Sequence, residues 1–254
     1  MAGDIFSGLI DIQTTVRESF GWSYQSDLAS ANLLAESLNN ESQYNVDMWL
    51  PDNRAVVLDT LKQKLLAAPK VVVVGAAVDE LDFIDFDFEN NVLIAADGSI
   101  GGIPKSANIA CVVTDFDGNP YLNDAAKSGL VFIAHAHGDN IDNWQNCLSE
   151  WQALERPPEL VLTHQITESI DGMHNFGGFT DGDRAVCLAI GLGVPKDNIS
   201  LIGFSTTKIG KWSGQTNPIR KLEKLAWMSR ILQIIGLDMQ IDSSVSEAPS
   251  NDLS

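Results

Sequence analysis

Aspartates follow three successive apolar segments of the chain, and their spacing could bind a metal ion. Asp97 closes the first segment, Asp115 and Asp117 close the next, and Asp139 follows the third. Carboxylates gathered in one place repel each other and raise each other's pKa, and a divalent cation removes that conflict. Mg²⁺ suits such a site, since it is usually held by a few carboxylates together with water and substrate phosphates. A turn-forming role is the alternative for each aspartate, because Asp-Gly is a common turn pair, but the repetition favours metal and phosphate.

Two histidines lie among these acids, in the segment HAHGDN at 135–140. His135 and His137 alternate along an extended segment, so they lie on the same face. Zinc hydrolases carry a further histidine where this chain has Asn140, and the two remaining histidines have no matching spacing. We therefore expect His137 and Asp139 to lie near transferred phosphates. For His135 a hydrogen-bonded structural role fits equally well, and zinc-dependent hydrolysis stays open as an alternative.

The segment NFGGFTDGDRA at 175–185 predicts a glycine loop followed by the start of a helix. Thr180 is the expected N-cap, with Asp183 at the third helical position as in a capping box. The free N–H groups of such a helix start suit phosphate. Arg184 could contact a phosphate or pair with an acid. For Asp181 and Asp183 the alternative is a simple preference of acids for the first helical turn.

The charge distribution disfavours nucleic acid and leaves one basic cluster for an anionic ligand. The formal net charge is −18, from 34 acids against 16 bases, whereas phosphate backbones require a basic surface. Six of the bases fall within one stretch, at Lys208, Lys211, Arg220, Lys221, Lys224 and Arg230. Beyond residue 219 a solvated helix face explains them as well as a ligand does. There is no P-loop, since GKW at 210–212 has tryptophan where serine or threonine is required, and GAAVDE at 75–80 lacks the glycines of an NAD fingerprint.

Six short apolar segments predict the framework that positions these residues. They are rich in β-branched residues and too short for helices, so they suit strands buried on both faces of a parallel sheet; they span 70–75, 91–98, 110–118, 129–139, 159–165 and 199–205. The segments between them can supply crossover helices. We predict an α/β fold with a doubly wound, mostly parallel sheet. Ligands bind outside the carboxyl ends of the strands in such sheets, where the polar residues gather.

The chain divides by pattern into three regions. Residues 1–66 are predicted to form a helical N-terminal region, 67–237 the α/β catalytic domain, and 238–254 a disordered tail rich in serine and aspartate. No run approaches the ~20 apolar residues that span a bilayer, and the N-terminus is acidic where a signal peptide is basic. The three cysteines are far apart, which suits free thiols in a reducing compartment. We expect a cytoplasmic protein; a homo-oligomer is compatible with the sequence.

These motifs together resemble the archaeal 6-hydroxymethyl-7,8-dihydropterin pyrophosphokinases. The segments AADG, TDFDG, HAHGDN and NFGGFTDGDRA and the ending IGKWS … KLEKL occur in the order that the family has them, and FGWSYQSDLASANLLAESL near the N-terminus is similar too. The likeness covers roughly residues 15–236. It implies Mg²⁺-dependent transfer of diphosphate from ATP to a reduced hydroxymethylpterin, with release of AMP, in tetrahydromethanopterin or folate synthesis. It also implies a fold similar to the catalytic domain of thiamine pyrophosphokinase.

The resemblance and the residues together give expected roles. Metal would be held by Asp97, Asp115 and Asp117, and the catalytic group would be Asp115, Asp117, His137 and Asp139, with His137 or one aspartate taking the hydroxyl proton. The ATP phosphates would contact Gly75, Gly98, Ser99, Arg184, Lys208 and Lys211. A flat, amide-like pterin needs polar groups at its edge and an apolar face, for which the candidates are Asn140, Asn175, Phe176, Thr180 and Asp181.

One segment departs from the family pattern, and three other functions stay open. GAAVDEL at 75–81 stands where a turn richer in glycine and proline is expected, so its backbone is less free to approach a phosphate at Gly75. The alternatives are a nucleotide-sugar-using protein of the same superfamily involved in surface glycosylation, a metal-dependent hydrolase, and a non-catalytic nucleotide-binding module.

Overall fold

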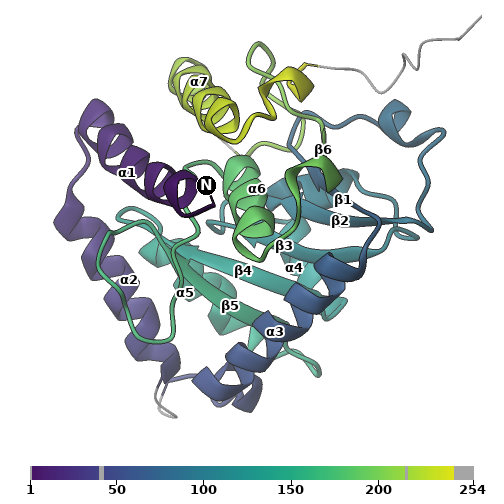
Figure 1. Ribbon diagram of the computed structural model, residues 1–254. Coiled ribbons are helices and arrows are strands. Elements are labelled where there is room, and N and C mark those ends of the chain that lie inside the picture. Colours follow the sequence, from purple (N-terminus) through teal and green to yellow (C-terminus); the bar gives the residue numbers. More distant parts are fainter. Residues whose placement is uncertain (1, 40–42, 215–216, 243–254) are drawn as a thin grey trace, which may run out of the picture.

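A single parallel sheet forms the centre of the protein. The computed structural model describes residues 2–39, 43–214 and 217–242. The sheet has six strands, all parallel, in the order β5-β4-β3-β2-β1-β6; they are β1 Lys70–Val74, β2 Asn91–Ala96, β3 Ile109–Thr114, β4 Val131–Ala136, β5 Glu159–His164 and β6 Ile199–Ile202. Five of them fall within the predicted apolar segments and β3 begins one residue before its segment, so the predicted α/β fold is confirmed (Figure 1).

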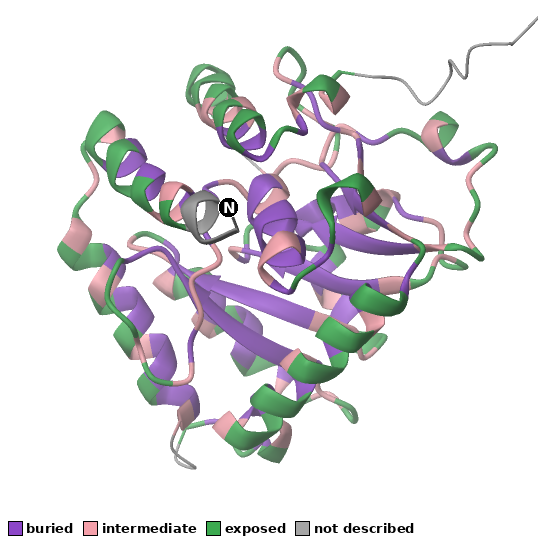
Figure 2. Cartoon of the chain, viewed as in Figure 1, coloured by how far each residue is buried: buried purple, intermediate pink, exposed green. Residues whose placement is uncertain are grey.

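Helices cover both faces of this sheet. The α-helices are α1 Ala2–Phe20, α2 Tyr24–Asn39, α3 Pro51–Ala67, α4 Tyr121–Lys127, α5 Ile141–Trp151, α6 Asp181–Gly191 and α7 Pro218–Ile235. Short 3-10 helices are η1 Asp47–Trp49, η2 Glu80–Phe83, η3 Asp97–Gly102, η4 Lys196–Asn198 and η5 Asp238–Gln240. Along β1, Val71 and Val73 pack in one core with α1, α3, α6 and α7, whereas Val72 and Val74 pack in another with α2, α4 and α5. The strands are therefore almost wholly buried, and so is α6, whereas the outer helices leave one side exposed (Figure 2).

The order of the strands creates a crevice between β1 and β6. The chain fills the sheet from β1 to β5 and then returns through α6, which contacts β1, β2 and β3, to place β6 beside β1. The segment after β1 leads to η2 on one face, and the segment after β6 leads to α7 on the other. Connections that leave neighbouring strands toward opposite faces open a ligand-binding crevice at the carboxyl ends.

The N-terminal helices share the core of the sheet. Leu9 of α1 and Leu61 of α3 lie in one hydrophobic core, and Leu34 of α2 lies in the other. The three cysteines are buried free thiols. None of the helices in the described ranges has both the length and the apolar character needed to cross a membrane. Of the predicted disordered tail, 238–240 form η5, and 243–254 lie outside the described residues.

Candidate active site at the carboxyl edge of the sheet

Three of the predicted aspartates meet at the carboxyl ends of β2 and β3. Asp97, Asp115 and Asp117 each place one carboxylate oxygen within 4.8 Å of the others. Asp97 begins η3 directly after β2, and the other two follow β3. The Oγ1 atom of Thr114, the last residue of β3, donates a 2.5 Å hydrogen bond to Asp97. We call these three aspartates the acidic cluster.

Backbone conformation helps to hold the acidic cluster in place. Asp97 has a φ of 48° and Phe116, between the other two acids, a φ of 73°. Side chains other than glycine disfavour this left-handed region, and such strain tends to gather at functional sites. The Phe116 ring is buried in the core, and its N–H donates to Thr114 Oγ1, so packing and hydrogen bonding stabilise the turn. In this turn, Asp115 and Asp117 come immediately before and after the buried Phe116.

The acidic cluster carries more negative charge than its surroundings neutralise. Burial, and then the charge of Asp117, raise the pKa of Asp97 well above its usual value. The charge of Asp115, and then burial, raise the pKa of Asp117. Burial and the charge of Asp115 raise the pKa of Asp181, at the start of α6, to about 7. These shifts are the signature of carboxylates forced together, a conflict that a bound cation would relieve.

Asp115 behaves differently because it faces cations. Burial alone would raise its pKa, but a hydrogen bond from His137 and the charges of His137 and Arg184 outweigh burial and hold the pKa well below the usual range. Its Oδ2 lies 3.2 Å from His137 Nε2 and 3.9 Å from Arg184 Nη1. Its Oδ1 is buried and has no hydrogen-bond partner among the described residues. An ionised, buried oxygen without a partner fits a ligand to a hard divalent cation.

His137 lies between two carboxylates. Its Nδ1 is 2.6 Å from Asp139 Oδ1, on the side opposite Asp115. Burial opposes its charge, but the hydrogen bonds to both acids raise the pKa of His137 to about 9. A protonated imidazole donates from both ring nitrogens, which matches the carboxylate that lies beside each of them. His135 is different, since it is buried and hydrogen-bonded to Thr163 and Gln165, as in the predicted structural role.

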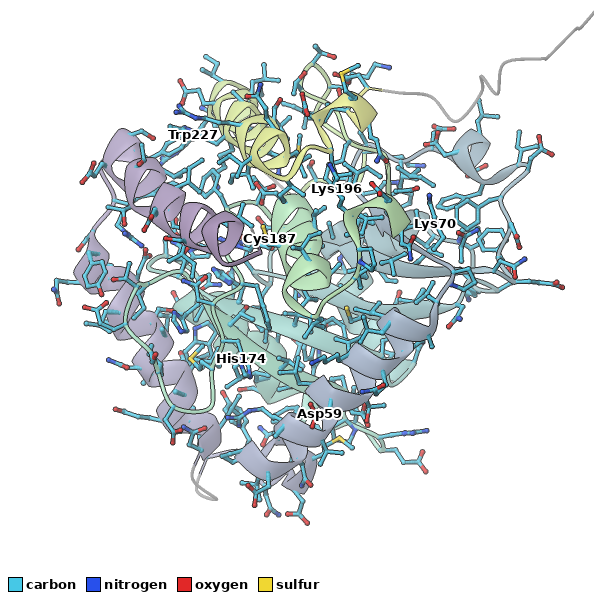
Figure 3. All side chains as sticks on the ribbon, viewed as in Figure 1. Asp59, Lys70, His174, Cys187, Lys196 and Trp227 are labelled. Carbon is cyan, nitrogen blue, oxygen red and sulfur yellow. The ribbon has the colours of Figure 1, made fainter. Side chains whose placement is uncertain are left out.

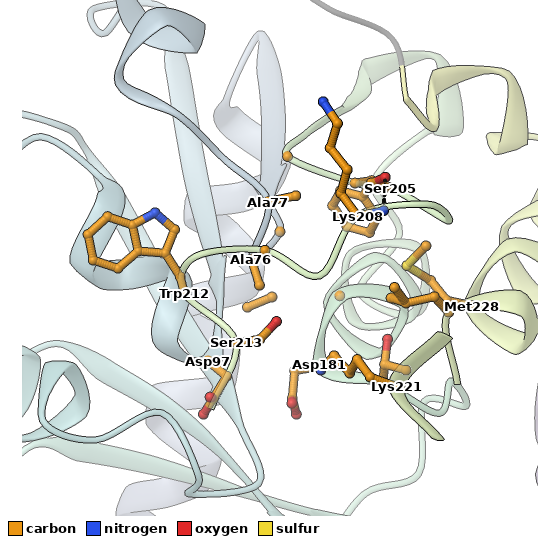
Figure 4. Close-up of a pocket in the computed structure, with 18 of the residues that line it drawn as sticks. Ala76, Ala77, Asp97, Asp181, Ser205, Lys208, Trp212, Ser213, Lys221 and Met228 are labelled. Atoms are coloured by element: carbon orange, nitrogen blue, oxygen red, sulfur yellow. Dashed lines mark hydrogen bonds between the residues drawn. The ribbon is translucent and has the colours of Figure 1, made fainter. Parts of the chain in front are cut away.

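Two pockets meet at the acidic cluster. The first, which we call the crevice pocket, lies between the segments after β1 and β6 and includes Gly75, Gly203 and Lys208. Figure 4 shows Asp97 and Asp181 at one end of this pocket and Lys208 and Ser205 at the other. The second, which we call the aromatic pocket, includes Trp22, Phe179 and His137. Both pockets are lined by Asp117, Thr180, Asp181 and Lys221, so two ligands can meet there.

Two further elements close the site. The predicted capping box at the start of α6 is present, with Asp183 accepting from the N–H of Thr180 at 2.6 Å. Arg184 on the same helix donates to Asp181 and Gln165. The segment 205–214 crosses the crevice, where Trp212 donates to the carbonyl of Val78 and covers the segment after β1. The lining residues Trp212, Ser213, Trp22 and Phe179 lie in segments that carry the family resemblance, but none of them was expected to bind a ligand, because only the fold brings these distant segments together.

Several predicted ligand contacts are used inside the fold instead. The Ser99 hydroxyl is fully buried and donates to the carbonyl of Val74. The Asn140 amide donates to the carbonyls of Asp115 and His135 and accepts from the His137 N–H, so it holds the 135–140 turn. Asn175 is hydrogen-bonded with Gln13 and the Ile166 carbonyl.

The other predicted contacts divide between the pockets and the scaffold. Gly75, Lys208, Thr180 and Asp181 line the crevice pocket. Phe176 lines a separate small cavity beside His135 and is stacked on His174. Gly98 is covered by the Trp212 carbonyl, which a Cβ at that position would overlap, and Lys211 lies over the Trp212 ring. Of the predicted pterin contacts, the structure therefore places only Thr180 and Asp181 in the two pockets that share the acidic cluster.

The fold and site define an open parallel α/β protein with an acidic site and two adjoining pockets at the carboxyl edge of its sheet. No model of a protein family matches the chain. A 6-hydroxymethyl-7,8-dihydropterin pyrophosphokinase of Pyrococcus furiosus is 33% identical over 220 residues, covering 85% of this chain and 84% of that protein. Proteins of the same name from Methanothermobacter thermautotrophicus and Methanocaldococcus jannaschii are each 28% identical, over 86% and 68% of this chain and 90% and 69% of their own lengths. The chain belongs to the 6-hydroxymethyl-7,8-dihydropterin pyrophosphokinase family, which confirms the resemblance found in the sequence.

Proposed function

We propose that the protein transfers diphosphate from ATP to 6-hydroxymethyl-7,8-dihydropterin, giving AMP and the pterin diphosphate, as a step of tetrahydromethanopterin or folate biosynthesis. The names of its relatives supply the substrate. The structural observation that carries the proposal is the meeting of two pockets at one acidic cluster. A transfer between two bound molecules requires such an arrangement, because donor and acceptor must be held in line.

The proposed reaction balances as a displacement at phosphorus. The pterin hydroxyl oxygen bonds to the β-phosphorus of ATP, and the bond from that phosphorus to the bridging oxygen breaks, so AMP leaves with that oxygen. The hydroxyl proton would pass to a carboxylate where the two pockets meet, since Asp117 and Asp181 line both pockets. Protonated His137 would then stabilise negative charge and would not act as the base.

The residues present fit Mg²⁺ at the acidic cluster. Asp97, Asp115 and Asp117 offer only oxygen ligands, which Mg²⁺ prefers. Among the described residues, this cluster includes no histidine. When bound, Mg²⁺ would neutralise charge on the transferred phosphates. Arg184, 3.2 Å from Asp181 and 3.9 Å from Asp115, and Lys208 in the crevice pocket would contact phosphate oxygens.

The direct test is the nucleotide product. Purified protein with ATP, Mg²⁺ and the reduced hydroxymethylpterin should form AMP in step with pterin consumption. ADP in place of AMP would contradict diphosphate transfer and point to an ordinary kinase or hydrolase. Sugar release from a nucleotide sugar without pterin would favour the glycosylation alternative, and binding of nucleotide without any product would favour a non-catalytic module.

The metal proposal has a readout that needs no turnover. A ligand that binds only the folded state stabilises it by RT ln(1 + [L]/Kd), about 2.7 kcal/mol at one hundred times Kd. Millimolar Mg²⁺ should therefore raise the melting temperature of EDTA-treated protein, and the same Mg²⁺ should restore activity that EDTA has removed. Restoration by Zn²⁺ alone, with zinc bound stoichiometrically, would contradict magnesium and favour the hydrolase alternative.

A further inference from the structure

Three aromatic rings form one wall at the aromatic pocket. Phe20 and Trp22 are stacked with ring centroids 4.6 Å apart and an angle of 14° between their planes. Phe179 lies 5.7 Å from both rings. Trp22 and Phe179 line the aromatic pocket, which also contains Asp117 of the acidic cluster. We call these three side chains the aromatic wall.

Residues from α7 hold the aromatic wall in place. The Arg220 guanidinium lies 5.4 Å from the Trp22 ring centroid, and the Lys224 ammonium lies 5.5 Å from the same ring and 5.9 Å from Phe179. Such cation–π contacts orient an aromatic ring without covering all of it. Phe179 is buried, whereas Trp22 is only half-buried. The wall is thus an aromatic surface with an accessible tryptophan, oriented by contacts within the protein.

Building on the proposed function, we propose that the accessible part of Trp22 binds the pterin ring by stacking, with the buried Phe179 packed against Trp22, while ATP occupies the crevice pocket. A flat heterocycle gains most from a parallel aromatic face. The N–H groups at the pterin edge need acceptors, and the Asp139 side chain, 84% exposed beside this pocket, offers a carboxylate. A ring stacked here directs its hydroxymethyl group toward Asp117, where the two pockets meet.

The crevice pocket has the features that ATP requires. Gly75 and Gly203 line it just after β1 and β6, at the carboxyl edge where ligands bind in parallel sheets. Lys208 adds a cation there. Cations and carboxylates line both pockets, with Lys208 and Lys221 in the crevice pocket and Arg184, Lys221 and Lys224 in the aromatic pocket. The aromatic rings, rather than the charge, therefore distinguish the aromatic pocket as the one suited to a flat heterocycle.

Steady-state kinetics of three variants test this assignment. Trp22→Leu should raise the KM for the pterin by roughly 5- to 150-fold, the range expected for the loss of one ring–aromatic stack. The KM for ATP should change by less than about 2-fold, and Trp22→Phe should recover most of the loss. Trp227→Leu is the matched control, because Trp227 is also partly buried and lies 5.4 Å from an arginine, but lies on α7 outside both pockets (Figure 3).

Calorimetric titration of the pterin in EDTA separates this inference from the proposed function. Wild-type protein and Trp227→Leu should bind the pterin without metal or ATP, and Trp22→Leu should bind it more weakly by the same factor as its KM rises. Equal pterin affinity in Trp22→Leu and wild type would overturn the assignment, even if AMP forms. A rise in the KM for ATP alone would place the nucleotide at the wall. If the KM of Trp22→Leu rises for both substrates, its melting temperature falls and Trp22→Phe recovers neither, then the aromatic wall is purely structural. That result would also overturn the assignment.

Discussion

Replacing Asp117 with asparagine should lower turnover by at least about 100-fold, the scale seen when a charge-stabilising group is removed from an active site. Asp117 is an exposed member of the acidic cluster and lines both pockets. Asparagine keeps its size but removes the charge that would hold Mg²⁺ against the polyphosphate. The melting temperature should stay the same or rise, because repulsion between Asp115 and Asp117 is relieved. Turnover at saturating Mg²⁺, with thermal melting in parallel, checks both expectations.

A second aspartate provides the control for this variant. Asp87 is exposed and shapes a turn by accepting hydrogen bonds from Glu89 and Asn90 before β2, whereas the acidic cluster lies at the carboxyl ends of β2 and β3. Asp87→Asn should leave turnover unchanged. If Asp117 only forms a turn before Gly118, Asp117→Asn should behave like Asp87→Asn, since Asn-Gly turns are also favoured. Near-normal turnover in Asp117→Asn would therefore exclude a ligand role.

Replacing Arg17 with methionine should destabilise the protein by about 3–5 kcal/mol, the effect of breaking a buried ion pair. The Nε atom of Arg17 on α1 lies 2.9 Å from Asp27 Oδ2 on α2, and both side chains are at most 7% exposed. Asp27 also accepts from the Gly138 N–H and from Gln165 Nε2. Methionine would leave the Asp27 carboxylate buried without its cation. The expected fall in melting temperature is on the order of 10 °C for a chain of this size.

An exposed ion pair offers the comparison for the buried one. The Nζ atom of Lys127 lies 2.9 Å from Asp124 Oδ1, with side chains 61% and 74% exposed. Lys127→Met should change the free energy of unfolding by less than about 1 kcal/mol, because water screens this pair. Arg17→Met together with Asp27→Leu should recover part of the loss, since no unpaired charge then stays buried. An Arg17→Met variant as stable as Lys127→Met would show that the buried pair contributes little.

This pair also connects the N-terminal helices to the site. Asp27 holds Gly138 beside His137, and through Gln165 it reaches Arg184, which lies 3.9 Å from Asp115. The division at residue 66 into a helical region and a catalytic domain stays a prediction from pattern. In the structure the two parts share both hydrophobic cores and one buried polar network. Substitutions in α1 and α2 that break this network should therefore alter the geometry of the active site.

The sequence by itself determined the sheet and the acidic cluster. Short, continuous apolar segments bounded by polar residues are typical of strands that are buried on both faces of a sheet. Parallel strands then bring their carboxyl ends to one edge of that sheet. Asp97, Asp115 and Asp117 follow such strands directly, so their meeting was predictable from position alone. The motif order likewise predicted the family, which the relatives confirm.

Only the tertiary structure decided which side chains near that edge face a ligand. Asn140 and Asn175 occur in motifs suited to binding, yet their amides satisfy buried backbone and side-chain groups of the fold. Trp22 and Phe179 are separated by more than half of the chain and meet only because the segment between α1 and α2 packs against the loop before α6, with Lys224 of α7 over both rings. Sequence position places a residue at the end of a strand, but the direction of its side chain in a loop depends on which distant groups satisfy its hydrogen bonds and apolar surface.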